Sequence, residues 1–324
     1  MAELRIALLG GGSMGTVHAA AYATLPEVSV VGVFSRDPAR AAAVAAICKA
    51  EPCADAAQLI QRADIDAVDV CLPSANHHDV VVPALEAGKH VFCESPLALD
   101  LDQAERMRDA ARRAGRLLQV GLLMRSVSAY SHVEAVARSG EYGRLLSVTT
   151  WRLGSYLHAD APDRKAHYGD PSTELMTFDF DFVLWLMGQP QSLSSSAARL
   201  PDGRPGEISA LLSYRQGRHA TVIASGLMPP GSPFTVGFRA LFERAAFAHL
   251  ATFNEVPPKT SFTVAAASMP PRPVSVAERN PYQVELQRFV DCMRGRADPA
   301  LLDADQAIEA LRLSLATSES ITSA

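Results

Sequence analysis

The chain has 324 residues, 48% of them hydrophobic, and a formal net charge of −5 at pH 7. This is enough apolar material for two domain cores, the acidic balance disfavours nucleic acid or an anionic membrane as partner, and no apolar run reaches the roughly 18 residues of a membrane span. The five cysteines are scattered and form no CxxC pair, which is typical of reduced thiols in a cytoplasmic protein and indicates neither a disulfide framework nor a metal site.

The first pattern along the chain is a short apolar run, residues 6–9, that ends in Gly10-x-Gly12-x-x-Gly15. The run is typical of a buried parallel strand, and residues 14–25 predict a helix directly after the glycines. In this setting Gly10 makes a tight turn, Gly12 lets the backbone approach a pyrophosphate, and Gly15 lets the helix pack on the strand. Because the free amides at the start of a helix bind phosphate, we expect a dinucleotide to contact Gly10, Gly12, Ser13, Met14 and Gly15.

Residues 28–34 predict a second strand, and the position that reads the adenosine ribose lies about 20 residues beyond the glycines. It falls on Ser35 and Arg36, where a site for NAD(H) would place an acidic side chain. The hydroxyl and the guanidinium instead suit the 2′-phosphate of NADP(H), so we expect NADP(H) to be favoured over NAD(H). Asp37 leaves the alternative open, since a shift of one residue would restore an acidic reader, but Asp37 before a proline also predicts the start of a helix over 39–50.

The rest of the first 122 residues continues to alternate strand and helix patterns. Because this alternation is typical of a parallel sheet with helices on both faces, we predict a doubly wound Rossmann domain over residues 1–122. Pro83 lies inside one expected helix and predicts a kink or a late start there, whereas Asp100 and Gly115 mark the ends of another. The further expected strands are 67–72, 89–93 and 117–121, and the expected helices are 77–87 and 100–115.

From about residue 123 the pattern changes to strands that follow one another through short turns. Such succession predicts an α+β domain over residues 123–324 with a mostly antiparallel open sheet. A sheet with a broad apolar face often packs against a second copy, so we expect a homo-oligomer, a dimer or tetramer formed through this sheet. The expected strands are 145–151, 208–214, 219–225, 234–242 and 245–253, and the expected helices are 131–139, about 281–294 and about 303–320.

Motifs spread over nearly the whole chain resemble those of one protein family. Beside the glycine turn and Arg125, they are Pro73-x-x-x-His77, Ala84-Leu85-x-Ala87-Gly88-Lys89-His90-Val91, Cys93-Glu94-Ser95-Pro96, Asp181-x-x-x-Trp185-x-x-Gly188 and Asn280-Pro281-Tyr282-x-x-Glu285-x-x-x-Phe289. Together they resemble the Gfo/Idh/MocA oxidoreductases, the family of glucose–fructose oxidoreductase and inositol dehydrogenase. The resemblance implies that Leu72, Pro73, Ser74 and His77 line the ribose and phosphates on the nicotinamide side, and that Glu94, with Ser95 beside it, holds the nicotinamide end. Taken alone, His77 would be read as a solvated histidine at the start of a helix.

The catalytic residues of the family do not carry over. The Glu-Lys-Pro of the family is Glu94-Ser95-Pro96 here, so the lysine that hydrogen-bonds the reacting oxygen is replaced by Ser95. Counted back from Gly188, the aspartate of the second signature is replaced by Glu174 and its histidine by Phe178. Hydride transfer to a carbonyl develops charge on oxygen, and a positioned general acid is worth about 10²–10⁴-fold in rate, so another group must supply the proton.

Candidates for that group stand next to the changed signature, where His167 or Tyr168 would be the acid and Glu174 or Asp170 would orient it. A solvated loop histidine and a packed tyrosine ring explain the first two equally well. Two further acids, Asp179 and Asp181, are placed at a helix N-terminus, where capping and the helix dipole account for both.

We therefore predict an NAD(P)-dependent oxidoreductase, with NADP(H) favoured, that transfers hydride to or from a small sugar, cyclitol or carbonyl substrate and uses Ser95, Tyr168, Glu174 or His167 in place of the usual residues. The alternative is a family member that binds the cofactor but is catalytically inactive, and acts as a sensor or assembly partner. A glycosidase that oxidises its substrate transiently is a third possibility, but it would need the same missing proton chemistry.

Overall fold

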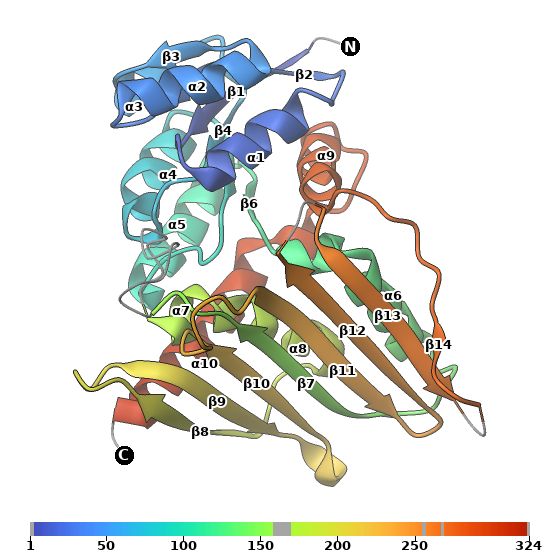
Figure 1. Cartoon of the computed structure of the whole chain (residues 1–324). Helices are drawn as coiled ribbons and strands as arrows, with labels where there is room; N and C mark the ends of the chain where they lie inside the picture. Colours follow the sequence, from blue (N-terminus) through green and yellow to red (C-terminus); the bar gives the residue numbers. More distant parts are fainter. Residues whose placement is uncertain (1–2, 158–169, 255–256, 267–268, 323–324) are drawn as a thin grey trace. The chain divides into compact units, whose positions relative to one another are not determined.

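The computed structural model describes residues 3–157, 170–254, 257–266 and 269–322. The chain forms two compact units, which Figure 1 colours along the sequence. The first consists of Met1–Ser126 and Arg279–Ile308, and the second of Val127–Glu278 and Glu309–Ala324. The units are therefore not consecutive halves, because the helix that we expected over about 281–294 in the second domain belongs by its contacts to the first unit.

The first unit is built on a parallel sheet in the strand order β3-β2-β1-β4-β5-β6, as the alternating sequence pattern predicts. Helix α9 packs on this unit through α1, and its Phe289 ring lies 5.6 Å from Phe92 of β5. The strands are β1 (Leu4–Leu9), β2 (Val28–Phe34), β3 (Glu51–Cys53), β4 (Ala67–Val70), β5 (His90–Cys93) and β6 (Leu118–Val120). The helices are α1 (Ser13–Tyr22), α2 (Pro38–Cys48), α3 (Ala56–Ile60), α4 (His77–Glu86), α5 (Leu101–Ala114) and α9 (Pro281–Met293), with short 3-10 turns η1 (Ser74–Asn76), η2 (Leu123–Ser126) and η4 (Pro299–Leu302).

Polar side chains start several of these helices, as the sequence predicts. Asp37 accepts hydrogen bonds from the amides of Ala39 and Arg40 at the start of α2, and Asp100 accepts one from the Gln103 amide at the start of α5. Each cap satisfies amides that have no partner inside the helix. Asp37 therefore caps α2 through its Oδ1, as its place before Pro38 predicts.

Helix α4 begins at His77 and continues through Pro83 to Glu86, close to the expected bounds. Of the two effects that Pro83 predicted, the late start does not occur, and the kink stays a prediction. Pro83 is exposed, and Gly88, with φ +78°, follows the end of the helix.

The second unit contains a mixed sheet in the order β14-β13-β12-β11-β7-β10-β9-β8, antiparallel except where β10 runs parallel to β7. Helices α6 and α8 cover one of its faces (Figure 1). The strands are β7 (Leu145–Leu153), β8 (Ser192–Arg199), β9 (Pro205–Ser213), β10 (His219–Ser225), β11 (Phe234–Phe242), β12 (Ala245–Phe253), β13 (Lys259–Ala266) and β14 (Arg272–Pro273). The helices are α6 (Ser128–Ser139), α7 (Pro171–Glu174), α8 (Met176–Met187), η3 (Arg215–Gly217) and α10 (Ala304–Thr322), of which α10 begins in the first unit.

The sequence pattern missed β8, β13 and β14, which lie at or next to the two edges of this sheet. The segment of β8 reads Ser-Leu-Ser-Ser-Ser-Ala-Ala-Arg and is exposed or half-buried throughout. Edge strands bury one face only partly, so they lack the regular alternation of large apolar side chains by which the inner strands are recognised.

The two faces of the sheet differ in what covers them. On the helical face Tyr130 of α6 packs with its ring centroid 4.6 Å from those of both Phe182 and Phe238. On the other face Ile223, Trp151 and Leu250 follow one another across neighbouring strands, with Gly237 between the last two.

In the part of the chain that the structure describes, no helix is both long and apolar enough to cross a membrane.

Candidate functional site

The glycine turn of the first unit is held by close backbone contacts. A Cβ at Gly10, where φ is +144°, would overlap the carbonyl oxygen of Cys71, and a Cβ at Gly15 would overlap the carbonyl oxygen of Gly10. Around Gly12, by contrast, a Cβ would meet nothing within 4 Å. Gly12 is also the N-cap of α1, and no side chain caps this helix. The amides at the start of α1 are therefore available to an anionic ligand, as a pyrophosphate site requires.

The end of β2 supplies polar and basic groups beside the turn. A Cβ at Gly11 would lie 2.7 Å from the Ser35 hydroxyl and 2.9 Å from Cβ of Arg40. Ser35 also accepts a hydrogen bond from the Asp37 amide, and Arg36 is exposed. Sequence reasoning missed Arg40, which is placed here by the first turn of α2. The signal that could have identified it is the N-cap residue Asp37, which is followed three residues later by an arginine.

His77 lies between the loops that follow β4 and β5. Its Nε2 is 2.8 Å from the carbonyl oxygen of Leu72, and its Nδ1 is 3.1 Å from that of Pro96 and 3.2 Å from that of Leu97. Burial lowers the pKa of this imidazole, although the three carbonyls oppose the shift. Both ring nitrogens thus face main-chain oxygens. The ring therefore holds the two loops together. Direct contact between His77 and a cofactor stays a prediction.

A buried group of ionisable side chains lies at the carboxyl ends of β4 and β5. The His18 imidazole of α1 is fully buried between two carboxylates, with Nδ1 2.8 Å from Asp69 and Nε2 2.8 Å from Glu94. A carboxyl oxygen of Glu285, from α9, lies within 4.8 Å of ligand atoms of both His18 and Glu94. Cys71 completes the group, with its sulfur 3.2 Å from Nδ1 of His18. We call His18, Asp69, Glu94 and Glu285 the acidic cluster.

Protonation in the acidic cluster follows from burial and charge. Burial, the largest single effect, lowers the pKa of His18, but the charge and hydrogen bonding of Asp69 and Cys71 together outweigh burial, and the pKa lies well above its usual 6.5. Glu285 is fully buried and neither of its oxygens has a hydrogen-bond partner among the described residues. Burial, reinforced by the negative charge of Glu94, raises the pKa of Glu285 well above 4.5. Among the carboxyl groups of the cluster, burial without a hydrogen-bond partner therefore favours the protonated form of Glu285.

Sequence reasoning missed His18, Asp69 and Glu285 as site residues, although each leaves a signal. His18 lies three residues after Gly15, on the face of α1 that packs against the sheet. Asp69 interrupts an otherwise apolar buried strand. A charged residue in such a place needs a partner of opposite charge, and the sequence does not say which one.

Ser95 and Glu94 lie together at the end of β5. The Ser95 amide donates to Oε2 of Glu94 at 3.1 Å, and the Glu94 side chain is 12% exposed. The Ser95 hydroxyl oxygen is buried and has no partner among the described residues. A Cβ at Gly121 would lie 3.0 Å from Glu94 Oε2, so the glycine after β6 makes room for this carboxylate.

In the second unit, the segment of the changed signature forms α7 and the start of α8. Asp179 lies in the first turn of α8, as expected, but its side chain does not cap the helix. It is fully buried and pairs with Arg152 of β7 at 2.7 Å, and Arg152 also lies 4.8 Å from the centre of the Phe178 ring. Burial raises the pKa of Asp179, and Arg152 opposes the rise. Asp181 is also buried, on α8.

The remaining catalytic candidates are placed unequally. Glu174 is half-buried at the end of α7. Asp170 caps α7 through the Ser172 amide and accepts a hydrogen bond from the Ser318 hydroxyl, so both of its oxygens are occupied. His167 and Tyr168 lie outside the described residues.

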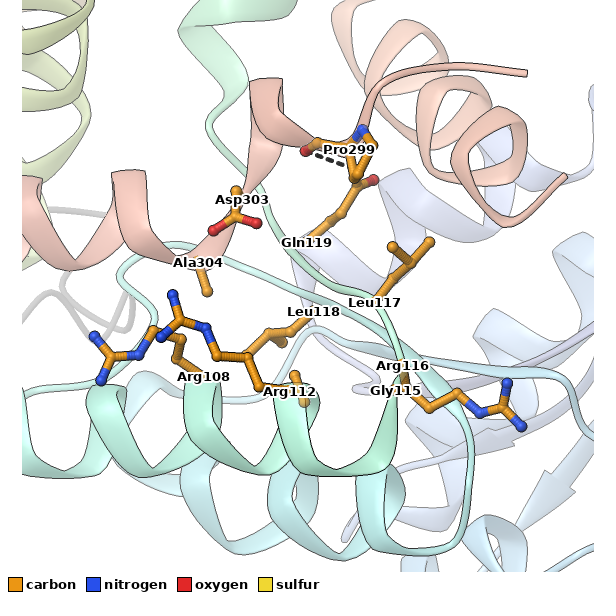
Figure 2. A pocket seen from close by; sticks show the side chains of 11 residues that line it. Arg108, Arg112, Gly115, Arg116, Leu117, Leu118, Gln119, Pro299, Asp303 and Ala304 are labelled. Carbon is orange, nitrogen blue, oxygen red and sulfur yellow. Dashed lines mark hydrogen bonds between the residues drawn. The ribbon is translucent and has the colours of Figure 1, made fainter. Parts of the chain in front are cut away.

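A pocket of about 180 Å³ lies in the first unit between the end of α5, β6 and η4 (Figure 2). Its wall includes Arg108 and Arg112, which pair with Asp305. Gln119 crosses it to donate a hydrogen bond to the carbonyl oxygen of Pro299. The pocket contains none of the residues predicted for cofactor or catalysis.

Comparison with known proteins gives matches over most of the chain. A family model described as an oxidoreductase family with an NAD-binding Rossmann fold matches residues 4–122, and one described as the GFO/IDH/MocA C-terminal domain matches residues 130–247. The chain is 31% identical to inositol 2-dehydrogenase of Rhizobium meliloti over 228 residues, 68% of each chain. It is 32% identical to inositol 2-dehydrogenase 4 of Saccharopolyspora erythraea over 216 residues, which are 62% of this chain and 60% of that protein.

Longer matches have lower identity. The chain is 26% identical to scyllo-inositol 2-dehydrogenase (NAD(+)) of Bacillus subtilis over 330 residues, 94% of this chain and 91% of the relative. The solved structure of UDP-N-acetylglucosamine 3-dehydrogenase from Acidithiobacillus ferrooxidans superimposes with a TM-score of 0.84 at 21% identity, covering 100% of this chain and 99% of that one. At that identity the likeness shows the fold alone.

The acidic cluster predicts a measurable stability effect of His18. Replacing it by Gln leaves Asp69 and Glu94 without the imidazolium between them, and removal of one partner from a buried ion pair costs about 3–5 kcal/mol. Because the pKa of His18 is raised in the folded state, its contribution is complete below the usual 6.5 and is lost as pH rises through the folded value. Urea denaturation of wild type and His18→Gln from pH 6 to 9 should show a gap in unfolding free energy that narrows with rising pH. A gap of constant size contradicts the ion pair, and His78→Gln, at a partly exposed site, is the control.

Proposed function

Because this chain belongs to the Gfo/Idh/MocA oxidoreductase family, we propose that it is an NADP(H)-dependent oxidoreductase of small sugars, cyclitols or related carbonyl compounds. The observation that carries the proposal is the uncapped start of α1 behind Gly12, which offers free amides and open space to a pyrophosphate. The substrate class rests on the names of the relatives, several of which are inositol dehydrogenases. The relatives support the class of compound, not one compound.

The preference for NADP(H) rests on the residues at the end of β2. Arg36 is exposed and Arg40 carries a side chain that is 67% exposed, so both guanidinium groups can reach a 2′-phosphate. Oδ1 of the nearby Asp37 accepts from the amides of Ala39 and Arg40, and its Oδ2 lies 3.5 Å from Nε of Arg40, so this carboxylate is engaged at the start of α2. One relative is named for NAD(+), so the preference has to come from this chain's own residues.

The residues around Glu94 fit the nicotinamide half of the cofactor. In a doubly wound sheet the dinucleotide crosses the carboxyl ends of the strands, with its adenosine half over β2 and its other half over β4 and β5. Glu94 and Ser95 directly follow β5. When bound, the nicotinamide supplies or accepts the hydride, and Glu94 would orient the ring while the loop held by His77 excludes water.

Proton transfer in this proposal differs from that of the family, because the lysine and histidine positions hold Ser95 and Phe178. Serine is a poor proton donor at neutral pH and phenylalanine donates no proton. We assign the acid to Tyr168 or His167, with Glu174 orienting it. Asp170 is a weaker candidate for that second role, since both of its oxygens already accept hydrogen bonds.

A second candidate function is cofactor binding without turnover. The observation in its favour is Arg152 against the Phe178 ring at 4.8 Å, which fills this position with a structural contact. Measured turnover decides between the two candidates.

We also propose that the chain forms a homo-oligomer through the uncovered face of its second sheet. Leu211, Leu241 and Leu250 are each more than a third exposed there, and large apolar side chains exposed on one face mark an interaction surface. Leu250→Arg should reduce the mass measured by sedimentation to that of one chain, because a charge in the interface would be buried without a partner. Leu99→Arg, at an equally exposed leucine of the first unit, should leave the mass unchanged. A wild type that sediments as a single chain rules the oligomer out.

Cofactor choice can be tested by parallel fluorescence titrations with NADPH and NADH. We expect wild type to bind NADPH more tightly than NADH. Arg36→Ala or Arg40→Ala should weaken the affinity for NADPH by about 10-fold, because each removes one charge-assisted hydrogen bond of about 1.5 kcal/mol. Neither variant should alter NADH binding. Equal loss for both cofactors would place these arginines away from the 2′-phosphate, and binding of neither cofactor would overturn the proposed function.

The missing lysine can be restored. If the pocket otherwise keeps the family's geometry, Ser95→Lys should raise the rate of carbonyl reduction by up to about 10²–10⁴-fold, the usual worth of a positioned acid. Steady-state oxidation of NADPH with a panel of ketoses and inosose-type ketones measures this. An unchanged rate at unchanged NADPH affinity would mean that the reacting oxygen does not lie near residue 95.

The complementary test removes the proposed acid in the variant Tyr168→Phe and its proposed orienting partner in a separate variant, Glu174→Gln. If Tyr168 is the acid, turnover should fall while NADPH affinity stays the same. Tight NADPH binding by wild type without turnover of any compound in the panel would favour the second candidate function, cofactor binding without catalysis.

A further inference from the structure

The acidic cluster holds α1 on the sheet, and the number of its carboxyl groups also determines how many protons it must keep. It joins three carboxyl groups to a single imidazole, and three of the four side chains are fully buried. If every carboxyl were ionised, the cluster would carry a net charge of −2 even with a charged imidazole. A buried site tolerates that charge poorly, so it keeps at least one additional proton.

Geometry assigns this proton to Glu285. Asp69 and Glu94 each lie 2.8 Å from a nitrogen of His18, so both are paired with the imidazolium. Glu285 has no such partner among the described residues, and its carboxyl is close to that of Glu94. The charge on Glu94 and the burial of Glu285 favour the protonated form, which agrees with the raised pKa of Glu285.

A metal ion is a poorer explanation of the same residues. Two atoms that bind one zinc ion at about 2.0–2.2 Å are held roughly 3.3 Å apart, whereas Nε2 of His18 and Oε1 of Glu94 are separated by 2.8 Å. That separation is the distance of a direct ion pair between the imidazolium and the carboxylate. The cluster therefore binds protons.

The remaining ionisable neighbours do not compensate for a change at Glu285. Tyr22 of α1 and Cys71 and Cys93 of the two strand ends are buried, and burial raises the pKa of each, so they stay neutral. Tyr282 of α9 contributes its ring, 6.0 Å from that of His18. Glu94 is the one member of the cluster that is partly exposed, and it faces the end where the proposed function places the nicotinamide.

We propose that Glu285, through Glu94, makes the site distinguish the two redox forms of the cofactor by charge, and that binding of the oxidised form releases the Glu285 proton. The proposal rests on the proposed function, which places the nicotinamide ring at Glu94. The oxidised ring carries one positive charge and the reduced ring carries none. A positive ring beside Glu94 replaces the proton as the compensating charge, so the Glu285 O–H bond breaks and the proton leaves to solvent past Glu94. No proton leaves when the neutral, reduced ring binds.

The test is a calorimetric titration of the whole protein with NADP⁺ and with NADPH, between pH 7 and 9, in two buffers of different ionisation enthalpy. For wild type we expect NADP⁺ to release up to one proton more than NADPH. Its affinity should rise with pH by up to about tenfold per unit while the NADPH affinity stays level, as linkage to one proton requires. Equal proton release with both forms overturns the proposal.

Glu285→Gln keeps the shape of the protonated acid but has no proton to lose. It should bind NADPH as wild type does and bind NADP⁺ with an affinity independent of pH and without the extra proton. Glu86→Gln is the matched control, since it makes the same change at an exposed glutamate of the first unit, and it should behave as wild type. Extra proton release that persists in Glu285→Gln would assign the proton to another group.

Adenosine 2′,5′-bisphosphate separates this inference from the proposed function. It presents the adenosine half without a nicotinamide, so it should bind to wild type without the extra proton. If its binding releases as many protons as the binding of NADP⁺, the proton comes from a group near the phosphates. The inference about Glu285 is then wrong, whereas the proposed cofactor site is still supported. If no nucleotide binds at all, the proposed function fails as well.

Discussion

The close approach of three backbone segments at the glycine turn determines the organisation of the first unit. Gly10 lies against the carbonyl of Cys71, and Gly15 against the carbonyl of Gly10, so that no side chain fits at either position. This contact brings α1 down onto the ends of β1 and β4. Only then can His18, one turn along the helix, reach Asp69 and Glu94 at hydrogen-bond distance. The same glycines that admit a pyrophosphate thus allow the buried ion pairs to form.

Those ion pairs connect parts of the chain that the sequence keeps far apart. Asp69 belongs to β4, Glu94 to the end of β5 and Glu285 to α9, almost 200 residues later. Charges of like sign are brought together in a low dielectric, where each protonation state depends on the others. A site of this kind responds to the charge of what binds next to it, and in the proposed function its neighbour is the nicotinamide ring.

The second unit keeps a charged pair of its own under the changed signature. Arg152 and Asp179 pair between β7 and α8, and Phe178 covers the guanidinium with its ring. A histidine at position 178 would place a titratable ring beside a buried arginine, whereas phenylalanine offers an apolar face that a cation favours. Phe178 is therefore part of a stable local packing around this buried ion pair.

The sequence by itself determined the Rossmann sheet apart from its short edge strand β3, the glycine turn and the helix starts at Asp37 and Asp100, because each depends on residues that are neighbours along the chain. It also indicated the inner strands of the second sheet, whose apolar side chains alternate. It did not reveal the edge strand β8, which buries too little to show a pattern, or Arg40 at the cofactor turn. Only the tertiary structure decided that His77 fastens two loops and that Glu285 joins the site of Glu94, since those contacts depend on segments that folding alone brings within a few ångströms.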